Sequence, residues 1–246
     1  MAPPADHRAV RVVIARDDRE LARRAAAEIA EALRRAVATR GLATLAVSGG
    51  STPGDLLAQL ATASLPWERI HVFQVDERVA PVGHPERNLE LLRARLFATG
   101  SVPADRVHAM PVEDRDLAAA AERYATELCA YAGDPPVPDV VQLGLGVDGH
   151  TASLLPGDPV LDVDDREVAV TGIYQGWRRL TLTVPPLARA RLLVWVVRGA
   201  DKRAMVERLV AGDPSIPAGR LPSERAVLFV DPDAGPATSP AVSGAE

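Results

Sequence analysis

Asp148 and His150 are the two residues whose types and spacing most directly suggest chemistry. They lie in a glycine-rich turn that follows Val140–Leu145, an apolar run typical of a buried parallel strand. An open α/β sheet binds its ligands beyond the carboxyl ends of its strands, which is where this turn is expected to lie. Histidine can accept a proton near neutral pH. The acidic neighbour, the flexible turn and the position at the sheet edge favour His150 as a general base over a structural histidine.

The same turn matches the dinucleotide-binding pattern G-x-G-x-x-G between Gly144 and Gly149. That pattern requires a full helix after the glycines, with its N-terminus facing a pyrophosphate. Here a short helix is expected to open at Thr151–Ser153, and Pro156 stops it after little more than one turn. Asp148 would also place a carboxylate beside the pyrophosphate. The match therefore does not predict a nucleotide site.

A second polar turn, Ser48-Gly49-Gly50-Ser51-Thr52, leads from a predicted strand into a predicted helix. Its hydroxyls and free backbone N–H groups suit an anion, which the helix dipole also favours. The turn lacks the G-K-[ST] sequence of a nucleotide P-loop, so a monophosphate suits it better than a nucleoside triphosphate. The alternative is a tight turn in which the hydroxyls only cap the helix.

Lys202 and Arg78 are the cationic candidates. Lys202 is the only lysine among 28 basic residues, and it is predicted to lie in the first turn of a helix. A cation there opposes the helix dipole at a cost of about 0.3–1 kcal/mol, and a bound phosphate would reverse the sign. Arg78 ends the triplet Asp76-Glu77-Arg78, directly after a predicted strand. Alone, this triplet would be a structural charge cluster; beside a phosphate-binding turn, Arg78 becomes a candidate for anion or oxyanion binding, held by one of the carboxylates.

The composition excludes several classes of protein. Apolar residues make up 47% and charged residues 25%, which is ordinary for a globular protein. The net charge of −5 provides no footprint for nucleic acid or an anionic membrane, and no apolar run reaches the ~20 residues of a membrane span. A single cysteine, Cys129, excludes an internal disulfide framework and is typical of the reducing cytoplasm. His71 and His84 lie too far from cysteine or paired carboxylates to predict a zinc site.

Hydrophobic periodicity indicates the elements that position these turns. Apolar runs predict strands at residues 10–15, 42–47, 70–75, 107–110, 140–145, 168–171, 180–184, 192–197 and 227–230. Helical spacing predicts helices at 17–40, from Pro53, around 89–96, at 114–131 and at 202–210. This alternation predicts an α/β fold with a mainly parallel, doubly wound sheet flanked by helices. We expect one domain over residues 1–230 and a disordered tail over residues 231–246.

Four polar segments follow predicted strands, at residues 48–52, 76–78, 148–153 and 198–202. In a parallel sheet, the turns that follow strands gather on one edge. We therefore expect the candidate residues in these segments to share a cleft.

The blocks that carry these candidates occur together in a known family. In order, they are Ser48-Gly-Gly-Ser-Thr-Pro53; Asp76-Glu-Arg78 followed by Pro81, His84 and Asn88; Gly144-Leu-Gly-x-Asp-Gly-His-Thr-Ala-Ser153; Arg179-Leu-Thr-Leu-Thr183; and Gly199-x-x-Lys202. With these blocks in this order, the chain resembles the 6-phosphogluconolactonase family, hydrolases of the oxidative pentose phosphate pathway, from about Val10 to Val230. It departs from the family at Arg87, where serine is usual, at Leu155, where phenylalanine is frequent, and at residues 172–177, where a proline-rich segment is expected.

The resemblance implies a modified Rossmann-like fold without a bound nucleotide, and 6-phospho-D-glucono-1,5-lactone as the substrate. It implies that His150 takes a proton from the water that attacks the lactone carbonyl, while Asp148 orients or tunes the imidazole. Arg78 would stabilise the developing negative charge or bind the phosphate. This chemistry requires neither a metal nor a cofactor.

For substrate binding, the resemblance implies that the turn from Ser48 to Thr52 and Lys202 hold the phosphate, together with Arg179. Asp76 belongs with these substrate-binding residues. The partner is thus a phosphorylated sugar lactone rather than nucleic acid or a membrane. The oligomeric state stays open, a monomer included.

Two other functions compete with this interpretation. Glucosamine-6-phosphate deaminase shares the fold and an Asp-Gly-His turn, but it typically continues with Ile-Ala-Phe-Asn-Glu-Pro, whereas this chain reads Thr151-Ala-Ser-Leu-Leu-Pro156. A sugar-phosphate-sensing regulator would need a DNA-binding element. Nine residues precede the first predicted strand and the end of the chain is not basic, so we expect no such element.

Overall fold

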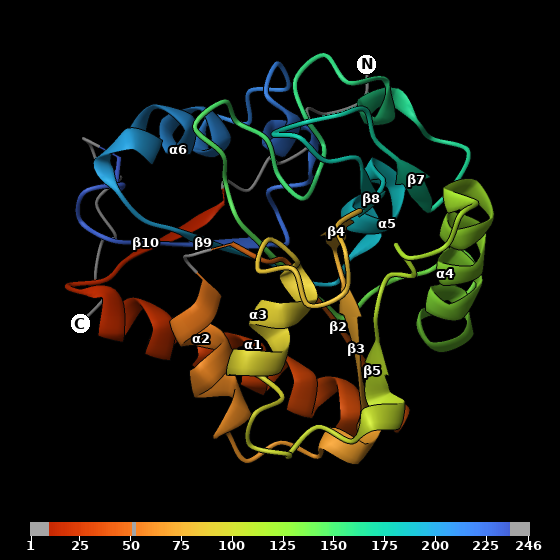
Figure 1. Cartoon of the computed structure of the whole chain (residues 1–246). Coiled ribbons are helices and arrows are strands. Elements are labelled where there is room, and N and C mark those ends of the chain that lie inside the picture. The colour runs from red at the N-terminus through yellow and green to blue at the C-terminus, as the bar shows by residue number, and fades with distance from the viewer. Residues whose placement is uncertain (1–9, 51–52, 237–246) are drawn as a thin grey trace, which may run out of the picture.

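The computed structural model describes residues 10–50 and 53–236, and within them a parallel sheet of seven strands forms the centre of the fold (Figure 1). The strands lie in the order β1-β10-β9-β6-β2-β3-β5, and all neighbouring pairs are parallel. Their bounds are β1 Arg11–Ile14, β2 Ala43–Val47, β3 Ile70–Gln74, β5 Val107–His108, β6 Val140–Leu143, β9 Leu193–Val197 and β10 Ala226–Val230. The predicted α/β fold with a mainly parallel sheet is confirmed.

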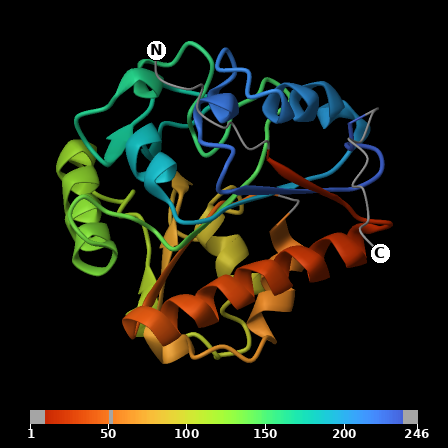
Figure 2. The same cartoon turned by 180° about the vertical axis from the view of Figure 1, so that it is seen from behind.

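Helices cover both faces of this sheet, as Figures 1 and 2 show. One face carries α1 (Asp18–Arg40), α2 (Pro53–Ala61) and α3 (Asn88–Arg95), and the other carries α4 (Leu117–Ala132), α5 (Val184–Arg189) and α6 (Arg203–Val210). Successive residues of a strand point to opposite faces, so Leu45 packs with the first group of helices and Ala46 with the second. Because both faces are buried, the strands appear in the sequence as continuous apolar runs.

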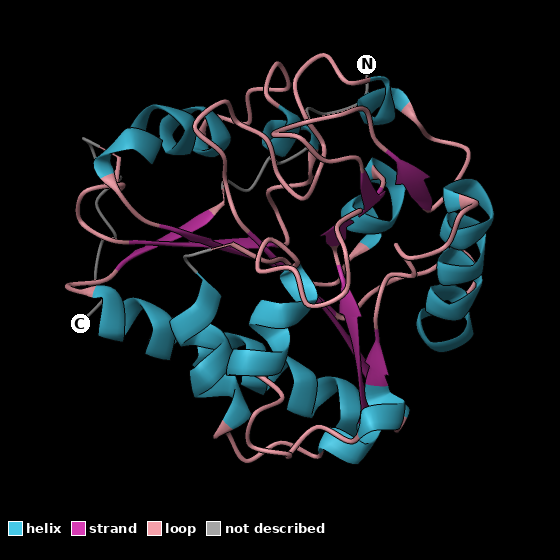
Figure 3. Cartoon of the chain, in the orientation of Figure 1, coloured by secondary structure: helices cyan, strands magenta, loops and turns pink. Residues whose placement is uncertain are grey.

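Loops and short 3₁₀ helices make most of the remaining connections (Figure 3). The 3₁₀ helices are η1 Trp67–Arg69, η2 Ala104–Arg106, η3 Pro159–Asp162, η4 Ala200–Lys202 and η5 Pro217–Arg220. No helix in the described part of the chain combines the length and the apolar character needed to cross a membrane.

A second, antiparallel sheet lies beside the first. In the described residues it has three strands, in the order β4 (Asp76–Arg78), β8 (Arg179–Leu182) and β7 (Val168–Val170). The sequence predicted β7 and β8 as strands without separating them from the parallel sheet, and it took Asp76–Arg78 for a turn. That interpretation was wrong because a polar triplet carries no strand periodicity; its pairing with β8 depends on contacts far along the chain.

Local signals at helix ends account for several boundaries. The Asp17 carboxylate accepts a hydrogen bond from Glu20 N at 2.7 Å and caps α1, which ends at Gly41 with φ of 80°.

Residues 151–153 do not open the short helix expected there: Thr151 and Leu154 form an isolated β-bridge.

The tail expected over residues 231–246 is packed against the fold at its start. The Asp231 carboxylate accepts hydrogen bonds from Gly199 N at 3.0 Å and Ala234 N at 2.8 Å, and Ala234 is fully buried. The packed part of the chain therefore extends beyond the boundary at residue 230 that the sequence predicted. Residues 237–246 lie outside the described residues.

Candidate active site

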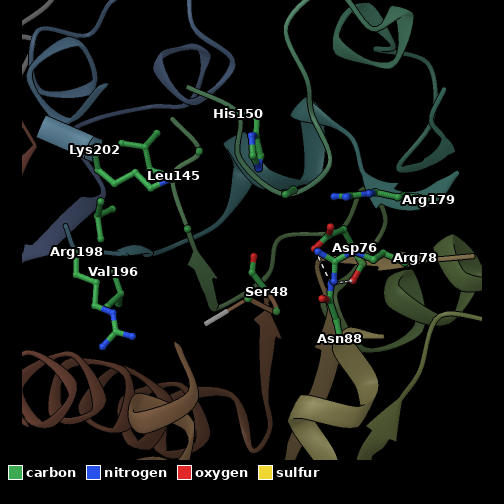
Figure 4. Close-up of a pocket in the computed structure, with 16 residues that line it drawn as sticks. Ser48, Asp76, Arg78, Asn88, Leu145, His150, Arg179, Val196, Arg198 and Lys202 are labelled. Atoms are coloured by element: carbon green, nitrogen blue, oxygen red, sulfur yellow. Dashed lines mark hydrogen bonds between the residues drawn. The ribbon is translucent and has the colours of Figure 1, made fainter. Parts of the chain in front are cut away.

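One cleft at the carboxyl ends of β2, β6 and β9 collects the candidate residues of this chain (Figure 4). Its volume is about 220 Å³, and the small sheet closes one of its sides. The four polar segments that the sequence placed at one edge meet here. The lining residues drawn from them include Ser48, Gly49, Gly50, Asp76, Arg78, His150, Arg198 and Lys202, and Arg179 of β8 joins them.

Asp148 and His150 are joined side chain to side chain in the turn after β6. Asp148 Oδ1 lies 2.6 Å from His150 Nδ1 and also accepts a hydrogen bond from His150 N at 3.1 Å. An ionised carboxylate only accepts, so Nδ1 carries the hydrogen and Nε2 of the neutral ring is the free acceptor. Burial alone would raise the pKa of Asp148, but hydrogen bonds from the backbone N–H and the ring of His150 hold this pKa below its usual value. The carboxylate therefore stays ionised and fixes the tautomer that a general base needs.

The glycine pattern of this turn makes room for the pair instead of for a nucleotide. A Cβ atom at Gly146 would lie 2.0 Å from His150 Nδ1 and 2.5 Å from Asp148 Oδ1. Gly149 has φ of 81°, and its N–H donates to Gly146 O at 3.1 Å to close the turn. Gly146 is thus required by the position of the imidazole, and Gly149 by the backbone conformation of the turn that carries it.

Asp76 is buried in the cleft wall and holds two polar neighbours. Its Oδ2 accepts from Ser153 Oγ at 2.5 Å, and its Oδ1 accepts from Asn88 Nδ2 at 3.2 Å. Arg179 Nη1 in turn lies 3.4 Å from Ser153 Oγ. Both carboxylate oxygens are therefore engaged by the protein, and Asp76 organises the wall that a ligand would contact.

Arg78 is held by Glu86, which the sequence did not predict. Its guanidinium donates through Nη1 to the Glu86 carbonyl oxygen, and its Nε lies 3.7 Å from the Glu86 carboxylate. One of the two neighbouring carboxylates holds Arg78 at its backbone, as expected: Glu77 Oε1 accepts a hydrogen bond from Arg78 N at 2.8 Å. Glu77 is fully buried and also binds the start of α3, where its carboxylate accepts from Asn88 N and Leu89 N at 2.8 Å each.

Asn88 lines the cleft, although the sequence pointed to it only as one residue of a motif and not as a site residue. It is the first residue of α3, and it lies over Gly49, where a Cβ atom would come within 1.9 Å of Asn88 Oδ1. The contact joins the α3 side of the cleft to the glycine turn after β2. The sequence indicated a close approach only through the glycine at residue 49, and no neighbouring residue showed that Asn88 would be the side chain that packs there.

Arg179 lies opposite Arg78 in the ladder of β4 and β8. The residue is 4% exposed, and its Nε has no hydrogen-bond partner within the described residues. Burial lowers the pKa of Arg179, and the charge of Arg78 lowers it further, while Asp76 opposes both. This buried, incompletely paired cation beside a second arginine is an arrangement suited to an anionic ligand.

The phosphate candidates lie across the cleft from the arginine pair. Ser48 is buried and anchored to β6: its N–H donates to Gln142 Oε1, and its hydroxyl donates to Gln142 O, both at 3.2 Å. Gly50 has φ of 101°, while Ser51 and Thr52 lie outside the described residues. Lys202 ends η4 and directly precedes α6, and Figure 4 shows it on the opposite side of His150 from Arg179.

Across residues 10–50 and 53–236, no group of three or more histidine, cysteine, aspartate or glutamate side chains is arranged to hold a metal ion.

The fold and this cleft define a class of sugar-phosphate enzymes. The chain belongs to the family of glucosamine-6-phosphate isomerases and 6-phosphogluconolactonases, whose model matches residues 16–229. Within the family, the chain is 38% identical over 209 residues to the 6-phosphogluconolactonase of Synechocystis sp., covering 82% of this chain and 87% of that protein. It is 36% identical over 222 residues to the 6-phosphogluconolactonase of Mesorhizobium japonicum, covering 88% and 89% of the two chains.

Solved structures agree with the fold. The 6-phosphogluconolactonase of Leishmania guyanensis matches with a TM-score of 0.83 at 25% identity, over 94% of this chain and 99% of that chain. A monomeric glucosamine-6-phosphate deaminase matches with a TM-score of 0.79 at 19% identity, over 91% and 98% of the two chains. The second likeness shows the fold alone, so the site must separate the two activities.

Proposed function

We propose that this chain hydrolyses 6-phospho-D-glucono-1,5-lactone to 6-phosphogluconate, with His150 as the general base. The observation that carries the proposal is the 2.6 Å contact between Asp148 Oδ1 and His150 Nδ1, which leaves Nε2 as a proton acceptor beside the cleft. The 6-phosphogluconolactonases that match most of this chain supply the substrate class.

In the first step, His150 Nε2 takes a proton from water while the water oxygen attacks C1 of the lactone. The carbonyl electron pair moves to oxygen and forms a tetrahedral oxyanion. When this intermediate collapses, the bond between C1 and the ring oxygen breaks. The imidazolium returns its proton to that oxygen, so the base is regenerated and one water has been added.

Positive charge on two sides of His150 fits the two anionic parts of the substrate. We assign the carbonyl oxygen to the side of Arg78 and Arg179, where developing negative charge meets a buried and incompletely paired guanidinium. We assign the phosphate to Lys202 and the turn that begins at Ser48. This assignment differs from the expectation drawn from the family resemblance, in which Arg179 helps to bind the phosphate.

The alternative activity, deamination of glucosamine 6-phosphate, needs a base at the second sugar carbon and further acid groups for ring opening and loss of the amine. Among the described residues that line the cleft, Asp76 is the only one with a carboxylate. Both of its oxygens are already engaged by Ser153 and Asn88. Lactone hydrolysis needs only the base, an oxyanion partner and a phosphate anchor, so the site favours the hydrolase.

The experiment is lactone hydrolysis measured on lactone generated in situ, with the spontaneous rate subtracted. Wild-type protein should exceed the spontaneous rate, and His150→Ala should lower turnover by roughly 10²–10⁴-fold while binding of phosphorylated product is kept. Near wild-type turnover in His150→Ala would move the base elsewhere, with Asp148 as the next candidate. Ammonia release from glucosamine 6-phosphate would refute the hydrolase assignment.

A further inference from the structure

Residues 172–177, where the sequence departs from the family's proline-rich pattern, form a tight hairpin between β7 and β8. Tyr174 N donates to Trp177 O at 2.9 Å, and Trp177 N donates to Tyr174 O at 3.2 Å. The two central residues, Gln175 and Gly176, have φ of 50° and 84°. Positive φ at both positions is the geometry of the two-residue turn that matches the twist of antiparallel strands. The turn therefore gives its two aromatic side chains a defined place.

Tyr174 contacts two cleft residues at once. Its ring centroid lies 5.8 Å from that of His150, with the rings inclined at 66°. The guanidinium carbon of Arg179 lies 5.1 Å from the centre of the same ring. Inclined aromatic pairs are favourable, and the face of a tyrosine ring attracts a guanidinium. One side chain thus touches both the candidate base and the buried arginine.

Hydrogen bonds alone leave both of these neighbours loosely held. His150 is fixed by Asp148 at Nδ1, which sets the position of one nitrogen but not the plane of the ring. The hydrogen bonds of Arg179 to Ser153 and Gln175 are long, at 3.4 and 3.5 Å, and its Nε has no partner within the described residues. The packing of Tyr174 supplies the missing constraint for each.

The other aromatic side chain of the hairpin reaches the loop that holds Arg78. Trp177 packs edge-on against His84, with ring centroids 5.2 Å apart. His84 Nδ1 accepts a hydrogen bond from Glu86 N at 3.2 Å, and Glu86 is the residue that binds Arg78. The hairpin therefore spans the wall from the base to both arginines.

We propose that Tyr174 is a positioning residue for the lactonase reaction, which fixes the plane of the His150 imidazole and holds the Arg179 guanidinium at a set place relative to it. The inference rests on the proposed function for its catalytic consequence. Its structural content, the orientation of His150 by the Tyr174 ring, can be tested separately.

The kinetic test compares Tyr174→Phe, which keeps the ring, with Tyr174→Leu, which removes it. Tyr174→Leu should lower kcat by roughly 10- to 100-fold with a smaller change in KM, because misplacing the reacting groups costs mainly turnover. Tyr174→Phe should restore kcat to within about twofold, which loss of hairpin stability would not do. Ile173→Ala changes a residue that is 76% exposed on the same hairpin and should leave kinetics and thermal unfolding unchanged. Tyr174→Gln provides a second ring-less variant in case the leucine variant does not fold.

The spectroscopic test follows the ring signals of His150 by nuclear magnetic resonance in ¹⁵N-histidine-labelled protein. These signals should move in Tyr174→Leu and Tyr174→Gln and stay in place in Tyr174→Phe. If they are the same in every variant, or if ring-less variants keep wild-type kcat, the positioning role is refuted. If the wild-type protein does not hydrolyse the lactone, the proposed function is refuted, and the His150 signals still decide whether Tyr174 orients the imidazole.

Discussion

Arg78 and Arg179 lie directly opposite each other in the antiparallel ladder of β4 and β8. Like charges in opposed positions of a sheet destabilise it, and burial adds to the cost at Arg179. Glu86 and Asp76 offset part of this charge, but Nε of each arginine is buried without a hydrogen-bond partner in the described residues. An anionic ligand between the two guanidinium groups would relieve the repulsion. We therefore expect the pair to bind an anion, at a cost to the stability of the free protein.

The opposed arginines predict that Arg179→Met lowers activity without lowering the stability of the fold. Loss of a donor that faces the developing oxyanion should lower kcat/KM by roughly 10²–10³-fold. The free energy of unfolding should stay within about 1 kcal/mol of wild type or rise, because replacing a buried charge by an apolar side chain is often neutral or stabilising. Urea unfolding and initial-rate kinetics on the same preparation measure both. A large loss of stability would mean that Arg179 is a structural cation.

Two glycines of the His150 turn are predicted to differ in how much activity is lost when each is replaced by alanine. Gly146→Ala should abolish most of the activity, because the new Cβ would lie 2.0 Å from His150 Nδ1 and would force the imidazole away from Asp148. Gly144→Ala is the matched control, since a Cβ atom there meets nothing within 4 Å. Circular dichroism should show both variants folded. Equal activity in the two variants would contradict the position of the imidazole described above.

Lys202 predicts a change in binding more than in turnover. Lys202→Ala should raise KM more than it lowers kcat, because a contact to a remote phosphate contributes mainly uniform binding. Unphosphorylated gluconolactone should be a poor substrate of the wild-type protein and should be insensitive to this substitution. Lys202→Arg tests the need for a compact point charge in a chain whose other basic residues are arginines. Equal wild-type rates on the two lactones would contradict the phosphate assignment.

The buried histidine pair between β3 and β5 predicts a pH dependence of stability. Burial, helped by the charges of His108 and Arg106, lowers the pKa of His71 from 6.5 to about 4. The unfolded chain therefore binds the proton more tightly, so this stabilisation is present above about pH 6.5 and is lost as pH falls toward about 4, by an amount on the order of 3 kcal/mol.

Urea midpoints measured from pH 7 to pH 4 check this prediction. His71→Phe is the comparison, because a phenyl ring can keep the stack on Tyr131, whose ring centroid lies 3.6 Å from that of His71. The variant should show a shallower loss of stability across this range. Identical pH profiles would exclude His71 as the titrating group.

The sequence alone determined the features that depend on neighbours along the chain. Apolar runs predicted the parallel strands, and Asp17 and Gly41 indicated the ends of α1 because capping needs only residues a few positions apart. The pairing of Asp148 with His150 was predictable for the same reason, since a tight turn brings residues i and i+2 together. The gathering of the polar segments followed from the geometry of any parallel sheet.

Only the tertiary structure decided which distant residues meet. The pairing of Arg78 with Arg179 joins positions 101 residues apart, and a three-residue polar strand has no periodicity that could reveal its partner. The contact of Asn88 with Gly49, the hold of Glu86 on Arg78 and the packing of Tyr174 on His150 depend likewise on how the small sheet docks against the large one. That docking is set by the burial of apolar surface between the layers, which is non-directional and leaves no signature at the polar residues it brings together.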